Sequence, residues 1–351
     1  MRTLAERVLR DHQGSTLLGG AAMIVGAVIF YLAAANQYQL SVGGNVGIDA
    51  LAAMGLTVVA GRAGQLALGQ AGFMAVGAYA VAYGTTSMHI SFLVATLMGA
   101  AIAFVLGLVV GWIALRLRGN YLAMATLAFG AIIYGLLQVQ SALGGLGGIY
   151  GIPPLKLIGT YSAPGSAYVF IWIVVVLAFA VCVLYLRGRA GRELHAIRDD
   201  ELAATSVGVN NTFRKLQTFG LSAILGAVAG SLLAANSYAV DPTLFQPLIS
   251  FQIFLMIVIG GLGSLGGAVA GAAIVVWLVQ LTPGTGDSAY VALGTLIIVL
   301  MAIFPRGLAG ICLWLLERAR GGRRTGEPPG ARGELAPAPD VAGARGAEAG
   351  G

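Results

Sequence analysis

The sequence predicts an all-α polytopic membrane protein with about ten transmembrane helices. Of its 351 residues, 58% are hydrophobic and only 10% are charged. A helix needs about 20 apolar residues to cross a bilayer core, and the chain repeatedly supplies such runs between charged or Gly- and Pro-rich breaks. Helices are expected because lipid offers no partner to a free backbone N–H or C=O group. The alternating strand pattern of an outer-membrane barrel is absent.

Ten spans follow from these runs and breaks, in chain order. The first resembles a signal peptide, but its apolar run is long enough to span, so we expect an uncleaved helix. The eighth and ninth spans are separated by a Gly-rich segment, and this pair could be partly re-entrant. The predicted spans are 16–35, 46–61, 66–84, 92–115, 119–140, 166–186, 216–236, 249–262, 267–281 and 289–304.

Basic residues set the expected orientation. With the N-terminus inside, 19 of the 20 Lys and Arg residues fall on the cytoplasmic side, and only Lys156 falls outside. Both termini are therefore expected to be cytoplasmic, with a short N-terminus (1–15), a membrane domain (16–311) and a tail (312–351). The tail is rich in Gly, Pro, Ala, Arg and Glu and is expected to be mostly disordered. The net charge of +6 indicates topology and not nucleic-acid binding.

No titratable residue is expected inside a span, which disfavours a proton-coupled carrier. The same absence argues less strongly against a sodium-coupled carrier, because carbonyl and hydroxyl groups can bind sodium. The residues expected at outer span ends or in outer loops are Asp49, Asp241, Asp287 and His89.

The chain also lacks the machinery of an enzyme. A P-loop needs Gly-Lys-Ser or Gly-Lys-Thr, yet Lys156 follows Leu155 and Lys215 follows Arg214. No clustered acid, base, nucleophile or metal ligands are found. The sequence therefore predicts a transport body without catalysis, metal or cofactor, whose energy comes from a partner.

The longest charged segment between spans is 188–215, which has signals for short helices. Asp199 or Asp200 is placed to N-cap a helix, with Glu201 favourable in its first turn. Gly208 is placed to end that helix in the left-handed conformation.

Upstream of this helix, residues 192–198 are expected to form another turn or two. Leu194 and Ile197 would then share one face. A helical hairpin of this kind suits a cleft on a soluble subunit, although a solvated charged loop is the common alternative in membrane proteins.

The run 202–208 resembles the Glu-Ala-Ala-x-x-x-Gly coupling motif of ABC importer permeases. It departs from that motif, because the acidic residue is Glu201, one position early, and Leu202 holds the expected place. The Ile-x-Leu-Pro continuation is also missing. The longer stretch 191–230, however, is similar to the loop and following helix of branched-chain amino acid ABC transporter permeases of the LivM type.

Further blocks carry the same resemblance in the same order and extend it over most of residues 45–311. GRAGQLALGQAGFMAVGAYAVA (61–82) looks like the family's Gly-Gln-x-Ser-Leu-Gly block, with Ala67 in place of Ser. LRLRGNYLAMATLAFG (115–130), GGLGSLGGAVAGA (260–272) and IFPRGLAGI (303–311) also resemble family segments.

The resemblance implies a type II ABC importer-like permease in the inner (cytoplasmic) membrane of a prokaryote, embedded in lipid. It implies as partners two ABC ATPase subunits, a second related permease and an extracytoplasmic solute-binding protein, with a small neutral amino acid as substrate. The residues implied in ATPase coupling are Arg192, Glu193, Arg198, Asp199, Asp200, Glu201, Ala203, Ala204 and Gly208.

Two broken segments are candidates for a translocation pathway, since paired Gly-interrupted segments often line one in transporters. The neutral amides of Gln65 and Gln70 could line it, or could bind neighbouring backbone where the helix is broken. The other candidates are Tyr121, Thr126, Gly263 and Ser264.

Two alternatives stay open at this point. Within the family, the solute could be urea or a short amide, because a binding protein selects it first. From a different class, a stand-alone channel or carrier for small neutral solutes would explain uncharged spans, but not the segment 192–208.

Overall fold

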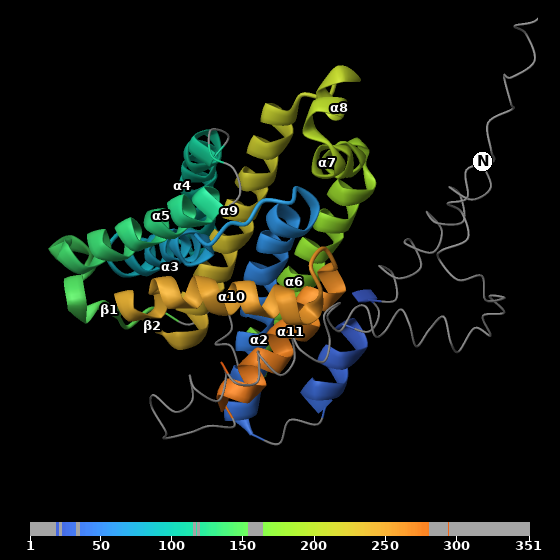
Figure 1. Cartoon of the computed structure of the whole chain (residues 1–351). Coiled ribbons are helices and arrows are strands. Elements are labelled where there is room, and N and C mark those ends of the chain that lie inside the picture. Colours follow the sequence, from blue (N-terminus) through green and yellow to red (C-terminus); the bar gives the residue numbers. More distant parts are fainter. Residues whose placement is uncertain are drawn as a thin grey trace, which may run out of the picture. The chain divides into compact units, whose positions relative to one another are not determined.

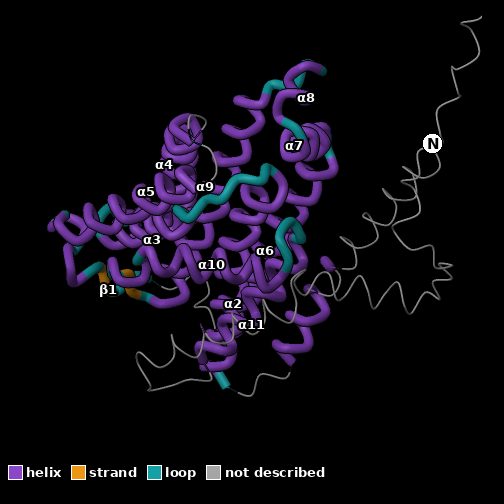
Figure 2. Tube along the Cα trace, in the orientation of Figure 1, coloured by secondary structure: helices purple, strands orange, loops and turns teal. Residues whose placement is uncertain are grey.

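Helices dominate the part of the chain that the computed structural model describes (Figures 1 and 2). The described residues are 19–20, 23–32, 36–114, 117, 120–153, 164–280 and 294. The predicted N-terminus, tail and almost all of the last predicted span lie outside them. Within them, the strands are two short antiparallel segments, β1 (Ile149–Tyr150) and β2 (Ala239–Val240).

The chain is a multi-pass membrane protein. Five helices are long and apolar enough to cross a membrane, and a bent pair gives a sixth candidate. The apolar helix Met23–Leu32 and α3 (Gln70–Thr86) are shorter. Ten spans are therefore not shown among the described residues. The five are α2 (Gln37–Leu56, continued by the π-helix η1, Thr57–Arg62), α4 (Phe92–Ala114), α5 (Asn120–Val139), α6 (Pro164–Arg187) and α9 (Asn211–Ser237).

The bent pair comprises α10 (Pro247–Gly260) and α11 (Leu265–Gln280), which meet at an angle of 120°. The chain turns at Gly261 and Gly263, whose φ angles of 106° and 92° suit glycine. The segment predicted as a possible re-entrant pair is therefore a broken span or a re-entrant loop.

Helix α2 forms the most buried part of the described bundle. Its glycines let neighbours approach closely: an added Cβ at Gly43 or Gly47 would meet Tyr168 or Ile171 of α6. The indole N–H of Trp172 also donates to the Gly43 carbonyl at 3.3 Å. Small residues in membrane helices act in this way because hydrophobicity alone cannot drive helix association in lipid.

Helices α3 and α9 pack closely because each has a glycine against the backbone of the other. An added Cβ at Gly77 of α3 would lie 1.9 Å from the Ala227 carbonyl oxygen, and one at Gly230 of α9 would lie 1.8 Å from that of Met74. The glycines of these two helices are therefore packing positions. Helices α4, α5 and α6 instead expose large apolar side chains suited to lipid, such as Leu97, Leu136 and Leu184.

Two helical breaks meet inside the fold. One lies between η1 and α3, where Gly64 has a φ of 67°, and the other is the turn between α10 and α11. An added Cβ at Gly61 would lie 2.4 Å from the Cα of Gly263, so the two backbones touch. Two glycines 202 positions apart in the sequence are thus in contact.

Between α6 and α9 the chain forms two short helices, α7 (Arg189–Asp199) and α8 (Glu201–Ser206). Figure 1 shows them together at one end of α6 and α9, while β1 and β2 lie toward the other end of α9. The predicted helical hairpin in segment 188–215 is therefore present.

Candidate functional site

The α7–α8 hairpin is defined by its caps. The side chain of Asp200 accepts hydrogen bonds from the backbone N–H of Leu202 and Ala203, at 2.8 and 3.0 Å, so it is the N-cap of α8. Gly208 follows the helix with a φ of 82°. Its N–H donates to the Thr205 carbonyl, and the next N–H donates to the Ala204 carbonyl, which is the Schellman pattern.

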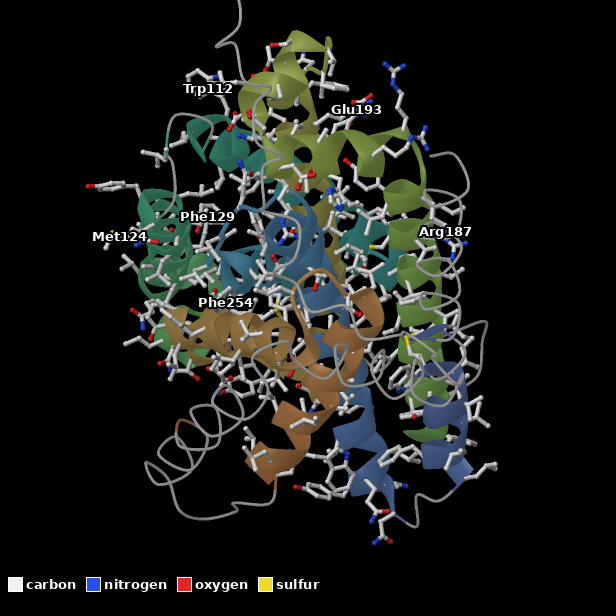
Figure 3. The ribbon with its side chains drawn as sticks, turned by 45° about the vertical axis from the view of Figure 1, so that its right-hand side comes forward. Trp112, Met124, Phe129, Arg187, Glu193 and Phe254 are labelled. Atoms are coloured by element: carbon white, nitrogen blue, oxygen red, sulfur yellow. The ribbon has the colours of Figure 1, made fainter. Side chains whose placement is uncertain are left out.

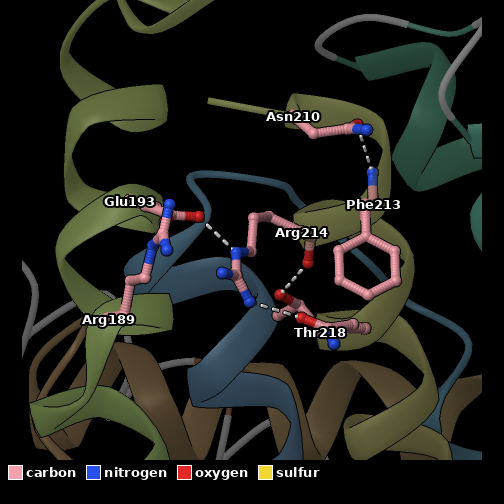
Figure 4. Close-up of polar contacts among 7 residues, drawn as sticks. Arg189, Glu193, Asn210, Phe213, Arg214 and Thr218 are labelled. Carbon is pink, nitrogen blue, oxygen red and sulfur yellow. Dashed lines mark hydrogen bonds and ion pairs between the residues drawn. The ribbon is translucent and has the colours of Figure 1, made fainter. Parts of the chain in front are cut away.

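Ion pairs hold this hairpin to the start of α9 (Figure 4). Glu193 of α7 accepts from Arg189 at 2.6 Å and from Arg214 of α9. Hydrogen bonds from Arg214 and then Arg189 lower the pKa of the Glu193 carboxyl below its usual value. In α8, Glu201 pairs with Lys215 of α9 at 2.8 Å. The Glu193 side chain is only 14% exposed, so its pairs are better shielded than ordinary surface pairs.

The two faces of the hairpin differ in exposure. Leu194, Ile197 and Ala204 are buried against the rest of the chain, as the pattern of Leu194 and Ile197 predicts. At the tip, Leu202 and Val207 are 79% and 78% exposed. Apolar side chains this exposed, in a hairpin that is otherwise well anchored, form a surface suited to a protein partner.

Other predicted residues of this segment are also exposed. Arg192 and Ala203 are exposed, and Asp199 pairs with His195 at 3.2 Å on the surface. An added Cβ at Gly208 would meet no atom within 4 Å, so the space beside it is open.

Arg198 connects the hairpin to the breaks in the membrane helices. Its guanidinium donates to the carbonyl of Gly61 at 2.6 Å, and an added Cβ on Gly64 would lie 3.2 Å from its Cγ. Because Gly61 also touches Gly263, a single side chain links α7 to both broken segments. Sequence reasoning places Arg198 in the hairpin but gives no signal for this contact.

The polar side chains after the first break are buried. Gln70 binds Ser222 of α9 twice: its Oε1 accepts from the Ser222 hydroxyl at 3.1 Å, and its Nε2 donates to the Ser222 carbonyl at 3.3 Å. Gln65 is also buried, but its Oε1 has no hydrogen-bond partner. One amide therefore joins two helices, and the other keeps an unused acceptor beside the break.

Thr126 and Tyr121 are not brought together, although both lie on α5. The Thr126 hydroxyl accepts from the N–H of Leu68 at 2.8 Å and is buried. Tyr121 is 71% exposed, on the face that also carries the exposed Met124 (Figure 3). Thr126 thus fixes the segment before α3, whereas Tyr121 faces outward.

The second break is also fixed by hydroxyl groups. The Ser264 Oγ accepts from the N–H of Gly267 at 3.1 Å, which caps the start of α11. Ser250 of α10 reaches the first break, because its Oγ accepts from the Ala71 N–H at 3.0 Å. Ser250 is a site residue that the sequence gives no reason to select.

The position expected for Asp49 is wrong. Because α2 begins at Gln37 and not near residue 46, Asp49 lies at the midpoint of the 25-residue span Gln37–Gly61 and not at its outer end. Packing against α6 draws the Gly-rich segment before residue 46 into the helix. One helical turn away, Asn45 accepts from the side-chain amide of Asn236 of α9 at 2.9 Å. Sequence reasoning misplaced Asp49 and gave no reason to select Asn45 or Asn236.

Comparison with known proteins gives a consistent result. Residues 38–304 match the family described as branched-chain amino acid transport system / permease component. The chain is 34% identical over 284 residues to the high-affinity branched-chain amino acid transport system permease protein LivM of Escherichia coli (strain K12). It is 33% identical over 280 residues to the LivM protein of Salmonella typhimurium.

Both alignments cover 73% of this chain and 66% of the LivM proteins. A more distant similarity, 27% identity over 241 residues, links the chain to a probable branched-chain amino acid transport permease protein LivH of Methanocaldococcus jannaschii. That alignment covers 62% of this chain and 75% of the LivH protein. No solved structure matches the chain.

Proposed function

Because the chain belongs to the branched-chain amino acid transport permease family, we propose that it is the membrane permease subunit of an ATP-driven importer for branched-chain or related amino acids. Its partners would be a second related permease, two ABC ATPase subunits and an extracytoplasmic solute-binding protein. Relatives of both the LivM and the LivH type support a second permease. The complex would act in a prokaryotic inner membrane, with both termini of this chain in the cytoplasm.

The α7–α8 hairpin is the observation that carries this proposal. Its inner face is buried, two acidic residues bind it to α9, and its tip exposes Leu202 and Val207. A stand-alone channel has no need for an apolar tip on a rigidly anchored helix. An ATPase subunit would provide the complementary cleft, and it would supply the nucleotide chemistry that the motifs of this chain do not.

The link from Arg198 to Gly61 suggests how force reaches the membrane. Closure of the ATPases would push on α7 and α8, and Arg198 would carry that movement to η1 and, through Gly61, to the turn at Gly263. The broken helices would then switch as rigid bodies between outward and inward access. Gly–Gly contact suits such movement, since no side chains must be repacked.

The translocation pathway would run past these two breaks. We assign to it Gln65, Gln70, Tyr121, Thr126, Gly263 and Ser264. The unused buried acceptor of Gln65 is the feature that favours a polar pathway there. Gln70 and Thr126 would hold its wall in place, because their side chains already bind neighbouring helices. The exposed Tyr121 would have to face it from outside, against the second permease.

The first experiment is co-purification from mildly solubilised native membranes. We expect the tagged chain to bring two P-loop ATPases and a second permease, and L202D to release the ATPases while the second permease remains. The substitution L136D, in the apolar surface of α5, serves as a control that should not release the ATPases specifically. Purification of the chain alone, with solute flux in liposomes, would instead favour a channel or carrier.

A substitution at Gly208 tests the hairpin more finely. A side chain there meets open space in this chain but must adopt an unfavourable φ, and it would enter the proposed docking surface. G208W is therefore expected to abolish uptake while membrane insertion stays normal. If G208W takes up substrate at the wild-type rate, Gly208 is not part of the coupling surface.

A further inference from the structure

Beyond its exposed first turn, helix α2 is closed to solvent except at two partly exposed polar side chains. From Val42 to Gly61, every side chain whose exposure is described is buried apart from those of Asn45 and Asp49. These two residues are four apart, so they lie on the same face of the helix. Within the stretch from Val42 to Gly61, the two partly exposed side chains are thus polar ones, near mid-span.

The notch faces away from α6. Gly43 and Gly47 point toward Tyr168 and Ile171 of α6. At about 100° per residue, Asn45 and Asp49 lie roughly half a turn around the helix from those glycines.

A neighbouring helix adds a third polar side chain to this face. Asn236 of α9 is also only partly buried, and its amide reaches Asn45. Asn45, Asp49 and Asn236 therefore form what we call the α2 notch.

Asp49 has an unusual charge environment. It is the one Asp or Glu within the span helices of the described residues, and its carboxylate forms no hydrogen bond or ion pair there. A lone carboxylate at mid-membrane depth is costly, and such residues usually face a substrate or ion path. The helices packed against this stretch of α2 place no Lys, Arg or His near it, because their basic residues lie at helix ends, as Arg187 and Lys215 do.

We propose that the α2 notch binds the ammonium group of the amino acid as it crosses the membrane. This inference rests on the proposed importer function and deepens it. An ammonium group has three N–H donors, and the notch offers the Asp49 carboxylate together with the amide oxygens of Asn45 and Asn236. A calcium-like cation would require six to eight oxygen ligands, more than these three side chains supply.

The proposal also separates substrate classes. Every α-amino acid carries the ammonium group, so the notch would serve leucine, isoleucine and valine alike and leave side-chain selection elsewhere. Urea and short amides carry no positive charge and would gain no ion pair from Asp49. A strong requirement for the carboxylate therefore favours amino acids over those solutes.

The test uses the complete importer in proteoliposomes with its binding protein, and measures both leucine uptake and ATP hydrolysis. We expect D49N to lower leucine transported per ATP by about tenfold or more, the loss typical of a charge-assisted hydrogen bond, while D49E retains partial uptake. The control is T57V, on the same helical rod, because the Thr57 hydroxyl bonds only its own helix at Ala53. Leucine uptake by D49N at the wild-type rate would overturn the proposal.

Two outcomes distinguish this proposal from the importer function itself. A wild-type complex that hydrolyses ATP but moves no amino acid would refute both, whereas normal uptake by D49N refutes the notch alone. If D49N does not assemble, N45C in a C182A/C312A background answers the question independently. A permeant maleimide should label N45C, and leucine should slow the labelling; no labelling would show that the notch is not a path and overturn the proposal.

Discussion

The N-cap of α8 allows a sharp test of the hairpin, because only one of two adjacent aspartates caps the helix. Asp200 accepts from two backbone N–H groups at the start of α8, whereas Asp199 pairs only with the exposed His195. Replacing either with Ala removes one negative charge from the same segment. Only D200A removes the cap.

The expected magnitude follows from the cap. Loss of an N-cap costs about 1 kcal/mol, which corresponds to a change of about fivefold in a local equilibrium. Helix α8 has only six residues, so it has few other internal bonds with which to resist opening. Amide exchange across residues 202–207 should therefore rise about fivefold in D200A, while exchange in α9 remains unchanged.

Hydrogen–deuterium exchange of the protein in nanodiscs measures this directly. D199A should leave exchange in α8 close to that of the wild type, since its pair is exposed and contributes little. Equal acceleration in both variants would mean that charge and not capping controls the helix. No change in D200A would mean that the Schellman end and the Glu201–Lys215 pair hold α8 without its cap.

Three further predictions concern the bundle, the link and the ion pairs. G230L should destabilise the fold by about 3 kcal/mol or more, seen as a lower thermal midpoint in detergent, because its Cβ would overlap the Met74 carbonyl. R198M should keep ATP hydrolysis but lower uptake, because it keeps the methylene contacts and loses the bond to Gly61. Since the pKa of Glu193 is lowered in the fold, its stabilisation is full above about pH 4.5 and is lost as pH falls through the lowered value, as followed by hairpin amide exchange.

Each of these has a matched control. Nothing lies within 4 Å of a Cβ added at Gly135 of α5, so G135L should leave the thermal midpoint nearly unchanged. R189M removes an exposed arginine from the same helix as Arg198 and leaves Glu193 paired with Arg214, so it should not uncouple transport. E193Q should abolish the acid-dependent step in exchange; a step of unchanged size in E193Q would assign the titration to another group.

The sequence was sufficient for features that depend on local chemistry. Apolar runs predicted most of the span helices, and the positions of Asp200 and Gly208 predicted both ends of α8. Caps and left-handed ends involve residues within one or two turns, so the information needed is contiguous. The sequence alone does not distinguish Asp199 from Asp200 as the cap, because helix starts vary by one or two residues.

Long-range contacts could not be predicted in the same way. The bond from Arg198 to Gly61 joins residues 137 apart, and the contact between Gly61 and Gly263 leaves no pattern beyond an abundance of glycine. Glycine in a membrane helix indicates that something approaches closely but not what approaches. The partner of each glycine became known only once the helices were placed.

Asp49 shows how one boundary changes a functional conclusion. Residues 36–45 contain Asn, Gln, Ser and Gly, so hydropathy starts the span after them and places Asp49 at its edge, where a carboxylate is unremarkable. In the fold, Tyr168 and Ile171 of α6 lie against Gly43 and Gly44, Asn45 accepts from Asn236, and the helix extends to Gln37. The same carboxylate then lies at the middle of the span, where leaving it unpaired costs free energy unless a charged solute visits it. A polar segment before an apolar run therefore does not mark the end of a membrane helix when a partner helix packs against it. Corrected in this way, the helix boundary places at mid-span the carboxylate that we propose as the ammonium ligand.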